Sequence, residues 1–367
     1  MFLALKEMKK DKGRFALILA IVVLISYLVF FLTSLAYGLS SANRLAVDMW
    51  DADRIILQKG SNKNILSSQL EKDDLEKFKD HDVDPINLSS TIIYKNGQKD
   101  EDSTLSVFMM GFDENSQKIP DLVEGRAIED FDTEIIGSIS LKNEDGFKLG
   151  DSIKLASNDR EYEIVGFTKE SKFSVRPVFY TSLEKASQSF MTYKKDTDAK
   201  SEATYNPPKR ISAIIVNDDK NIKTDDFDII GIDEFIKNLP GYLAQVLTFA
   251  LMIGFLIVIA SIVLGVFMYI ITMQKKSTFA ILKIQGISNS YIGKSVIGQT
   301  LIVSVFGVGL GLGLTYLSGL FLPSSVPFMA NLKYYLIISL LMVITTLLGA
   351  IFSVRGVSKI QALEALD

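Results

Sequence analysis

The 367-residue sequence contains no cysteine and only one histidine. Without thiols the protein cannot form disulfides, carry out thiol redox chemistry or bind a metal through cysteine. The histidine, His81, lies in the charged run Lys79-Asp80-His81-Asp82, and no other residue of a metal-ligand type is spaced with it. We therefore interpret His81 as a solvated surface residue and expect no metal site.

Motifs for nucleotide binding and for catalysis are also missing. Gly293-Lys294-Ser295 resembles the end of a phosphate-binding loop, but that motif needs a glycine five positions before Gly293, and position 288 is serine. No Ser/His/Asp set and no pair of carboxylates stands out among the acidic residues. The sequence therefore predicts a chain that is not an enzyme and that binds no cofactor of its own.

Charge is absent from four long segments, residues 15–43, 238–274, 295–332 and 334–354. One charge at the middle of a span costs about 2.5–3.5 kcal/mol on the insertion scale, so uncharged apolar runs of 18 or more residues predict transmembrane helices. The first apolar run, residues 15–37, is longer than the 7–15-residue core of a secretory signal. We expect an uncleaved anchor and an integral membrane protein with four spans.

The charges that are present are distributed unevenly. Residues 40–240 hold 27 basic and 39 acidic residues, a net charge of −12, whereas the remainder holds 12 basic and 4 acidic residues. Basic residues cluster beside the apolar runs, which by the positive-inside rule places both termini and residues 275–294 in the cytoplasm. Residues 40–240 and 323–333 then lie outside, and the acidic outer part argues against nucleic acid as a partner.

Residues 44–239 have the composition of a soluble domain, and their pattern predicts an α+β fold. Short β-branched or aromatic runs punctuated by Gly, Asn and Asp predict strands at 55–57, 106–110, 135–136, 152–155, 161–167 and 211–216. Residues 69–79 and 182–193 look helical, and the polar stretch 194–209 is expected to be a mobile loop. The fold class is an α-helical membrane protein with four transmembrane helices and an α+β extracytoplasmic domain.

The spans are expected to continue beyond the membrane. Pro240 suits the first turn of the second helix, where its missing N–H costs nothing. Residues 240–274 make about 52 Å of helix at roughly 1.5 Å per residue, more than the 40–45 Å of a bilayer with its headgroups. We expect the following organisation: 1–14, a cytoplasmic amphipathic helix against membrane lipid; 15–43, first span and stalk; 44–239, extracytoplasmic domain; 240–274, stalk and second span; 275–294, cytoplasmic coupling helix; 295–322, third span; 323–333, outer loop; 334–354, fourth span; 355–367, cytoplasmic tail.

Two short patterns point to helix contacts. In residues 274–286, apolar side chains at Ala280, Ile281 and Ile284 share one helical face beside three lysines, which favours a cytoplasmic contact helix over a plain basic loop. In the third span, Gly307 and Gly311 form a small-xxx-small pair that lets a neighbouring helix approach closely. Gly309 and Gly313 form a second such pair. A dinucleotide-binding loop is excluded there because no strand precedes the glycines.

These motifs resemble those of one family of membrane proteins. Residues 279–288, FAILKIQGIS, and the closing IQALEALD resemble the cytoplasmic signatures of FtsX-like, MacB-type ABC transporter permeases. GFD at 111–113, LVEGR at 122–126, KLGDSIKL at 148–155 and IVGF at 164–167 are similar to its periplasmic-core domain. Two positions depart from the family's pattern. Thr278 stands where the cytoplasmic signature begins with an acidic residue, and Gln361-Ala362 stands where the closing motif has Asp-Pro. WDAD at 50–53 looks most like HrtB-type haem-efflux permeases.

The resemblance implies a homodimeric permease in the plasma membrane of a bacterium, with two copies of a separate P-loop ATPase that binds ATP and Mg. It implies export of an amphiphilic compound, with haem as the leading candidate. Alternatives are mechanotransmission to an outer partner such as a cell-wall hydrolase, and lipoprotein export. The segment Phe279 to Leu282 is expected to enter a groove on the ATPase. The residues expected to couple to the ATPase are Lys276, Phe279, Ile281, Leu282, Lys283 and Gly286.

An amphiphile that partitions into the outer leaflet is reached most directly through a lateral cleft between the first two spans. Aromatic and thioether side chains make an adaptable apolar wall, and Met or Tyr can ligate haem iron. The alternative is that these residues are interface anchors or meet lipid or the other subunit. The candidate cleft residues are Tyr37, Met49, Trp50, Phe249, Met252 and Leu256.

Overall fold

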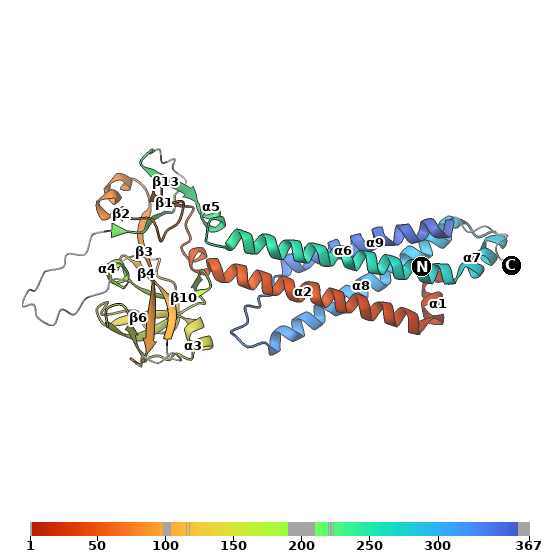
Figure 1. The fold of residues 1–367 in the computed structure, drawn as a ribbon, viewed down its shortest axis with the longest axis horizontal. Coiled ribbons are helices and arrows are strands. Elements are labelled where there is room, and N and C mark those ends of the chain that lie inside the picture. The colour runs from red at the N-terminus through yellow and green to blue at the C-terminus, as the bar shows by residue number, and fades with distance from the viewer. Residues whose placement is uncertain are drawn as a thin grey trace, which may run out of the picture. The chain divides into compact units, whose positions relative to one another are not determined.

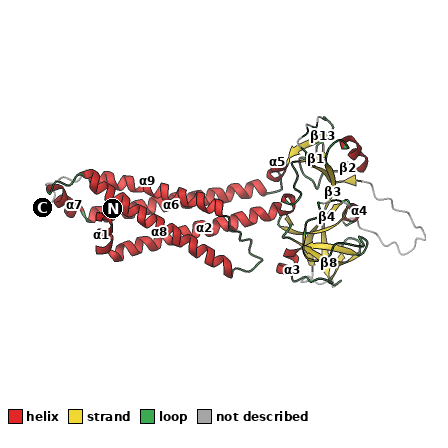
Figure 2. Cartoon of the chain, turned by 180° about the vertical axis from the view of Figure 1, so that it is seen from behind, coloured by secondary structure: helices red, strands yellow, loops and turns green. Residues whose placement is uncertain are grey.

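The computed structural model describes residues 2–97, 104–114, 116, 118–189, 210–218, 220, 222 and 224–358. The chain divides into two compact units. A helical unit comprises Met1–Gly38 and Val246–Asp367, and a sheet unit comprises Leu39–Gln245. Figure 2 shows that the strands all belong to the sheet unit. The predicted loop at 194–209 and the predicted C-terminal signature lie outside the described residues.

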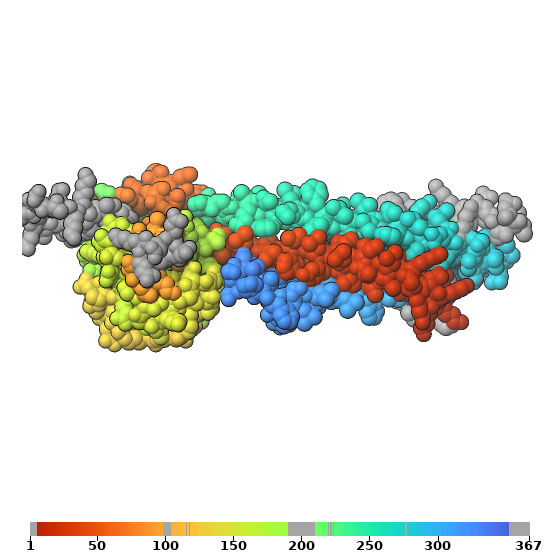
Figure 3. Space-filling view, turned by 60° about the horizontal axis from the view of Figure 1, so that its bottom comes forward, coloured from red at the N-terminus to blue at the C-terminus, as the bar shows by residue number. Residues whose placement is uncertain are grey.

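The helical unit contains four helices that are long and apolar enough to cross a membrane. They run alongside one another (Figure 1), and in Figure 3 the red α2 lies between the turquoise α6 and the blue α8. This confirms the four predicted spans. The helices of this unit are α1 (Phe2–Lys10), α2 (Lys12–Asp48), α6 (Tyr242–Gln274), α7 (Lys276–Ile284), α8 (Asn289–Phe321) and α9 (Leu332–Ser358). Residues 39–48 of α2 and 242–245 of α6 belong to the sheet unit.

The start of α6 differs from the prediction. Pro240 lies in a turn rather than in the first turn of the helix, and the N–H of Tyr242 donates to Leu239 O at 3.1 Å. Gly241, between them, has a φ of +76°, a conformation that glycine adopts without steric cost. The second long helix is therefore separated by this turn from the short helix α5 (Ile232–Lys237).

The sheet unit is built on one mixed sheet of 11 strands with the main order β13-β1-β12-β3-β4-β10-β6-β8-β5, and β2 and β11 form a separate two-stranded sheet. Helices α3 (Ile139–Asp145), α4 (Leu183–Gln188) and α5 accompany it. The strands are β1 (Arg54–Gln58), β2 (Leu70–Glu71), β3 (Val83–Lys95), β4 (Thr104–Phe112), β5 (Leu122–Gly125), β6 (Glu134–Ser138), β7 (Ser152–Leu155), β8 (Glu161–Thr168), β9 (Lys172–Phe173), β10 (Arg176–Ser182), β11 (Arg210–Ile211), β12 (Ala213–Val216) and β13 (Phe227–Gly231). The predicted α+β class is confirmed.

Six of these strands close into a ring. β7 pairs with both β3 and β8, so the path β3-β4-β10-β6-β8-β7 returns to β3. Alternate residues of β4 enter two different cores, as the period of a strand requires. Val107 and Met109 join a cluster that includes Phe147, Phe167 and Phe179, whereas Phe108, Met110 and Phe112 join the cluster around Trp50.

The longest strand, β3, was not predicted from the sequence. Its polar residues Asn87, Ser89 and Thr91 are buried because their side chains hydrogen-bond to the backbone at and just beyond α4. The predicted helix at 69–79 is also partly wrong. Leu70 and Glu71 pair with β11, and only Lys72–Phe78 forms a helix, of the 3₁₀ type.

Candidate functional site

The α7 helix occupies the segment for which a contact helix was predicted, which confirms the helix there. It ends in a Schellman motif, in which Ile287 N donates to Leu282 O and Gly286 N donates to Lys283 O, both at 3.0 Å. Gly286 has the left-handed φ of +86° that this motif requires. The Ser288 side chain then caps α8 by accepting from Tyr291 N. Gly286 is therefore the helix stop, which is a structural role.

One face of α7 is fixed inside the helical unit. Phe279 is only 1 % exposed, and Ala280 is fully buried. The structure thus places Phe279 in the interior, not at the surface where insertion into an ATPase groove would require it. Leu282 is partly buried against the same cluster. We call this set the α7 core: Phe15, Ile18 and Val22 of α2, Leu264, Met268 and Ile271 of α6, Phe279 and Ala280 of α7, and Ile292, Val296 and Val303 of α8.

The other face of α7 is open and apolar at its centre. Ile281 is 50 % exposed and Ile284 is 58 % exposed, and they lie three residues apart on the same side of the helix. Ser277 and Thr278 are exposed beside them, and Lys283 is half-buried. Ile281 and Ile284 form what we call the open face of α7. The side chain of Lys276 lies outside the described residues.

A polar cluster connects α1 to the start of α7. Lys275 Nζ lies 2.9 Å from Asp11 Oδ2 and 3.8 Å from Glu7 Oε2. Gln299, which is buried in α8, donates from Nε2 to Glu7 Oε2. The hydrogen bond from Lys275, aided by its positive charge, lowers the pKa of Asp11 below its ordinary value. We call Glu7, Asp11, Lys275 and Gln299 the α1 latch.

The latch was missed in the sequence. Glu7 and Asp11 are spaced i, i+4 within a lysine-rich segment, so they share a helical face, and this spacing was the available signal. Gln299, a polar residue in an uncharged span, was a second signal because such residues are costly in a membrane and face the protein interior. Their partner Lys275 could not be identified without the fold.

Gly307 and Gly311 lie where α8 crosses α2. A Cβ added to Gly307 would be 2.5 Å from Val22 Cγ1, and one added to Gly311 would be 2.6 Å from Ser26 Cβ. Both distances are too short for a real contact, so glycine permits the close approach. Added Cβ atoms at Gly309 and Gly313 would meet nothing within 4 Å. The first glycine pair packs against a helix and the second does not.

The six predicted cleft residues are divided between the two units. Tyr37, Phe249, Met252 and Leu256 belong to the helical unit, and Met49 and Trp50 to the sheet unit. The Tyr37 ring packs on Tyr334, with centroids 5.3 Å apart. Met252 is 43 % exposed. Leu256 is partly buried among neighbouring spans, and Phe249 is half-exposed.

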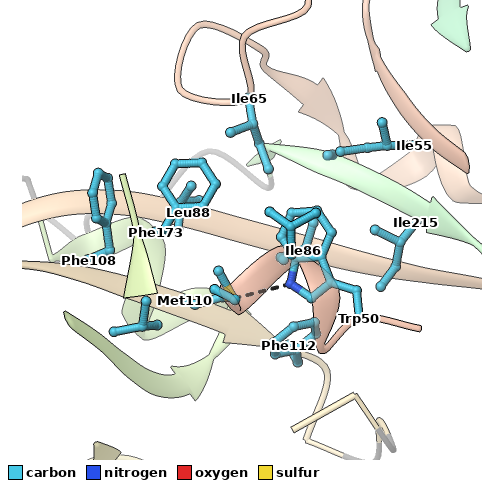
Figure 4. Close-up of a cluster of buried hydrophobic side chains, with 14 of the residues drawn as sticks. Trp50, Ile55, Ile65, Ile86, Leu88, Phe108, Met110, Phe112, Phe173 and Ile215 are labelled. Atoms are coloured by element: carbon cyan, nitrogen blue, oxygen red, sulfur yellow. Dashed lines mark hydrogen bonds between the residues drawn. The ribbon is translucent and has the colours of Figure 1, made fainter. Parts of the chain in front are cut away.

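Trp50 corrects the prediction most clearly. It is 1 % exposed in the core of the sheet unit, where its Nε1–H donates to Met110 Sδ at 3.4 Å (Figure 4). Its ring stacks on Phe235 with centroids 5.9 Å apart. Met49 lies nearby, with its sulfur 3.9 Å from the Tyr180 hydroxyl. Trp50 is therefore a core residue and lines no lateral cleft in the membrane.

Comparison with known proteins gives the helical part of the chain a family. Residues 250–362 match the FtsX-like permease C-terminal domain. The chain carries an FtsX-like permease domain. The whole permease is 26 % identical over 366 residues to a protein of Staphylococcus haemolyticus (strain JCSC1435) that is named hemin transport system permease protein HrtB. That match covers 100 % of the permease and 99 % of the relative.

A protein of the same name from Staphylococcus epidermidis (strain ATCC 12228 / FDA PCI 1200) is 27 % identical over 372 residues, with the same coverage. Among solved structures, the periplasmic region of MacB from Actinobacillus actinomycetemcomitans covers 51 % of the permease and 92 % of that chain, at 15 % identity and a TM-score of 0.34. The extracellular domain of YknZ covers 46 % of the permease and 83 % of that chain, at 14 % identity and a TM-score of 0.30. The likeness therefore consists of an FtsX-like permease domain in residues 250–362 and of relatives over the whole chain that are named as permeases.

Proposed function

We propose that this permease exports an amphiphilic compound from the membrane, with haem as the leading candidate. Support for haem comes from the name of the two full-length relatives. In this proposal two permease chains form a dimer, and two copies of a separate P-loop ATPase bind ATP and Mg. Both termini and α7 face the cytoplasm, as the basic clusters beside the spans favour.

The observation that carries the proposal is that α7 is buried on one face and exposed on the other. The open face of α7 presents two isoleucines to the surroundings outside the membrane-spanning helices. An exposed apolar pair on a short helix is the kind of surface that a partner protein covers. We propose that the ATPase contacts this face through Ile281, which is one of the predicted coupling residues, and through Ile284, which replaces the buried Phe279 in the contact.

The buried face explains how such a contact could move the transporter. Phe279 and Ala280 pack against residues of α2, α6 and α8 in one continuous cluster. Close-packed interiors transmit displacements because they contain little free volume. When the ATPase pushes on α7, the inner ends of these three spans are displaced together, and no nucleotide site in the permease is needed.

The cargo surface we propose lies in the helical unit, at Tyr37, Phe249, Met252 and Leu256. Met252 offers an exposed thioether and Tyr37 a phenol, and both groups can ligate haem iron. Trp50 and Met49 are no longer included in this surface. The competing interpretation of the same residues is contact with lipid or with the second permease chain.

The ATPase contact is tested by introducing a charge on the open face. The double substitution Ile281→Asp/Ile284→Asp should bury unpaired carboxylates in the contact, which costs about 2 kcal/mol or more and weakens the complex roughly 30-fold. The matched control is Val123→Asp, at an equally exposed valine in β5. Co-purification of the double variant with the cognate ATPase at wild-type yield would refute the assignment.

The cargo is tested by ATP hydrolysis of the reconstituted complex. Haem should stimulate hydrolysis, and Tyr37→Ala/Met252→Ala should shift that stimulation to higher haem concentration while basal hydrolysis stays unchanged. Phe321→Ala, at the last residue of α8 with a ring that is 86 % exposed, is the control. If haem and other amphiphiles leave hydrolysis unchanged although the ATPase binds, export is wrong and mechanotransmission becomes the better interpretation.

A further inference from the structure

The short helix α1 has two differently charged sides. On one side lie the carboxylates of Glu7 and of Asp11, which directly follows the helix. Both lie close to Lys275, Glu7 also accepts a hydrogen bond from Gln299, and both are at most 26 % exposed. The side chains of Lys9, Lys10, Lys12 and Arg14 are exposed. The surface that residues 9–14 present to their surroundings is therefore strongly basic.

The position of this basic surface indicates what it meets. Lys12 and Arg14 belong to the first turn of the spanning helix α2, and Leu17, one turn later, is 60 % exposed and apolar. An exposed leucine in a spanning helix meets lipid tails, so the basic groups one turn earlier lie at the depth of the lipid headgroups. Charges within about 10 Å of an anionic surface interact with it at 0.1 M salt.

The opposite side of α1 leads to the start of α7. Lys275 immediately precedes α7, and its carbonyl accepts the N–H of Phe279 at 3.0 Å, which forms the first turn of the helix. Lys275 is also held by Asp11 and lies over the Phe15 ring at 5.6 Å. The Lys275 side chain is only 13 % exposed, so the latch is a packed contact rather than a surface ion pair.

From this arrangement we propose that α1 binds anionic phospholipid headgroups through Lys9, Lys10, Lys12 and Arg14, and that the α1 latch transmits this binding to the orientation of α7. The fraction of anionic lipid in the membrane then sets the orientation of α7. An acidic protein surface could also meet these lysines. The bilayer is favoured because the basic groups adjoin the lipid-facing part of α2 and because the open face of α7 carries isoleucines rather than cations.

The binding step is tested on the purified full-length permease in nanodiscs, without any ATPase or cargo, so its outcome is independent of the proposed transport function. The probe is a fluorescent phosphatidylglycerol that competes with phosphatidylcholine for the protein surface. Each basic residue near an anionic surface contributes about 1 kcal/mol, so Lys9→Gln/Lys10→Gln should weaken the phosphatidylglycerol preference roughly 30-fold. Lys72→Gln/Lys79→Gln, at exposed lysines of the sheet unit, is the matched control and should leave the preference unchanged.

The transmission step uses the absence of cysteine. Ser277→Cys places a single labelling site in the first turn of α7, at an exposed position. A spin label there should change mobility as phosphatidylglycerol replaces phosphatidylcholine. Adding Lys275→Met, which removes the cation of the latch, should abolish this response while phosphatidylglycerol binding persists.

Three results would overturn the proposal. The first is equal phosphatidylglycerol preference in Lys9→Gln/Lys10→Gln and in the control. The second is a label at residue 277 that does not respond to phosphatidylglycerol in the otherwise unchanged protein, or that still responds after Lys275→Met. The third is that Lys9→Gln/Lys10→Gln keeps its phosphatidylglycerol preference but no longer binds the cognate ATPase. That result would mean that the basic side of α1 binds an acidic protein surface.

Discussion

Replacing Gly311 by alanine should destabilise the helical unit although only one methyl group is added. That methyl would lie 2.6 Å from Ser26 Cβ, 2.8 Å from Tyr27 N and 3.0 Å from Val23 O. Two of these three atoms belong to the backbone of α2, so no rotation of a side chain can make room. The helices α2 and α8 would have to separate locally.

The change in the free energy of unfolding for Gly311→Ala is the sum of two opposing effects. Overpacking a tight contact costs about 1–3 kcal/mol. Alanine in place of glycine also favours a helix by about 1 kcal/mol, which offsets part of that cost. Gly309→Ala isolates the second term, because a Cβ there meets nothing within 4 Å. The two variants should therefore differ by about 1–3 kcal/mol, with Gly311→Ala the less stable, and Gly311→Leu should be worse still.

The assay is thermal unfolding in one detergent at one scan rate, because membrane proteins commonly unfold irreversibly and apparent Tm then depends on scan rate. A difference of 1–3 kcal/mol corresponds to an apparent Tm gap of about 1–4 °C for a chain of 367 residues. Equal Tm values for the Gly311 and Gly309 variants would show that α2 and α8 are not in close contact at Gly311.

Further predictions concern the sheet unit. Trp50→Ala should cost about 3–5 kcal/mol, as expected for a large buried ring, when unfolding is followed by circular dichroism; an unchanged stability would contradict its place in the core. Val175, at the β9–β10 turn, has a φ of +70°, so Val175→Gly should stabilise by about 0.5–2 kcal/mol in chemical denaturation, whereas the control Val123→Gly should destabilise. Arg126, with help from the backbone N–H groups of residues 129 and 130, lowers the pKa of Glu134 from 4.5 to about 2. Because the folded pKa is the lower one, this stabilisation is complete above pH 4.5 and is lost as pH falls towards 2; Glu134→Gln should flatten the stability profile in that window, and an unchanged profile would refute the pairing.

The membrane helices could be predicted because the signal is local. A run without charge is sufficient to identify a span, and Gly286 followed by Ser288 marks the stop of one helix and the cap of the next. The periodicity of residues 274–286 likewise identified α7. Which of its faces is buried could not be read from periodicity, because both Phe279 and Ile281 are large and apolar and only the neighbouring helices distinguish them.

The predictions that failed, for β3 and for Trp50, have a common physical cause. The residues that these segments contact are distant in the sequence. Strand β3 contains Pro85, Asn87 and Ser89, and the burial of the two polar side chains depends on α4, about 100 residues later, which accepts hydrogen bonds from Asn87 and Ser89. Trp50 follows a spanning helix, where tryptophan commonly anchors at the interface. Its partners Met110 and Phe235 are far away in the chain, and they draw the ring into a core instead.

The β9–β10 turn also acts on α2 within the sheet unit. Ser174 N donates to Asn43 O, and Val175 N donates to Ala42 O, both at 3.1 Å. The turn leads directly into β10, which pairs with β4 on one side and β6 on the other in the closed ring. Successive helix carbonyls are offset by about 100° around the axis, so these two bonds fix the angular setting of α2 as well as its height. If this end of α2 rotates about the helix axis, the two hydrogen bonds therefore pull on β10, a strand of the ring. Within the sheet unit, the end of α2 cannot turn independently of the sheet.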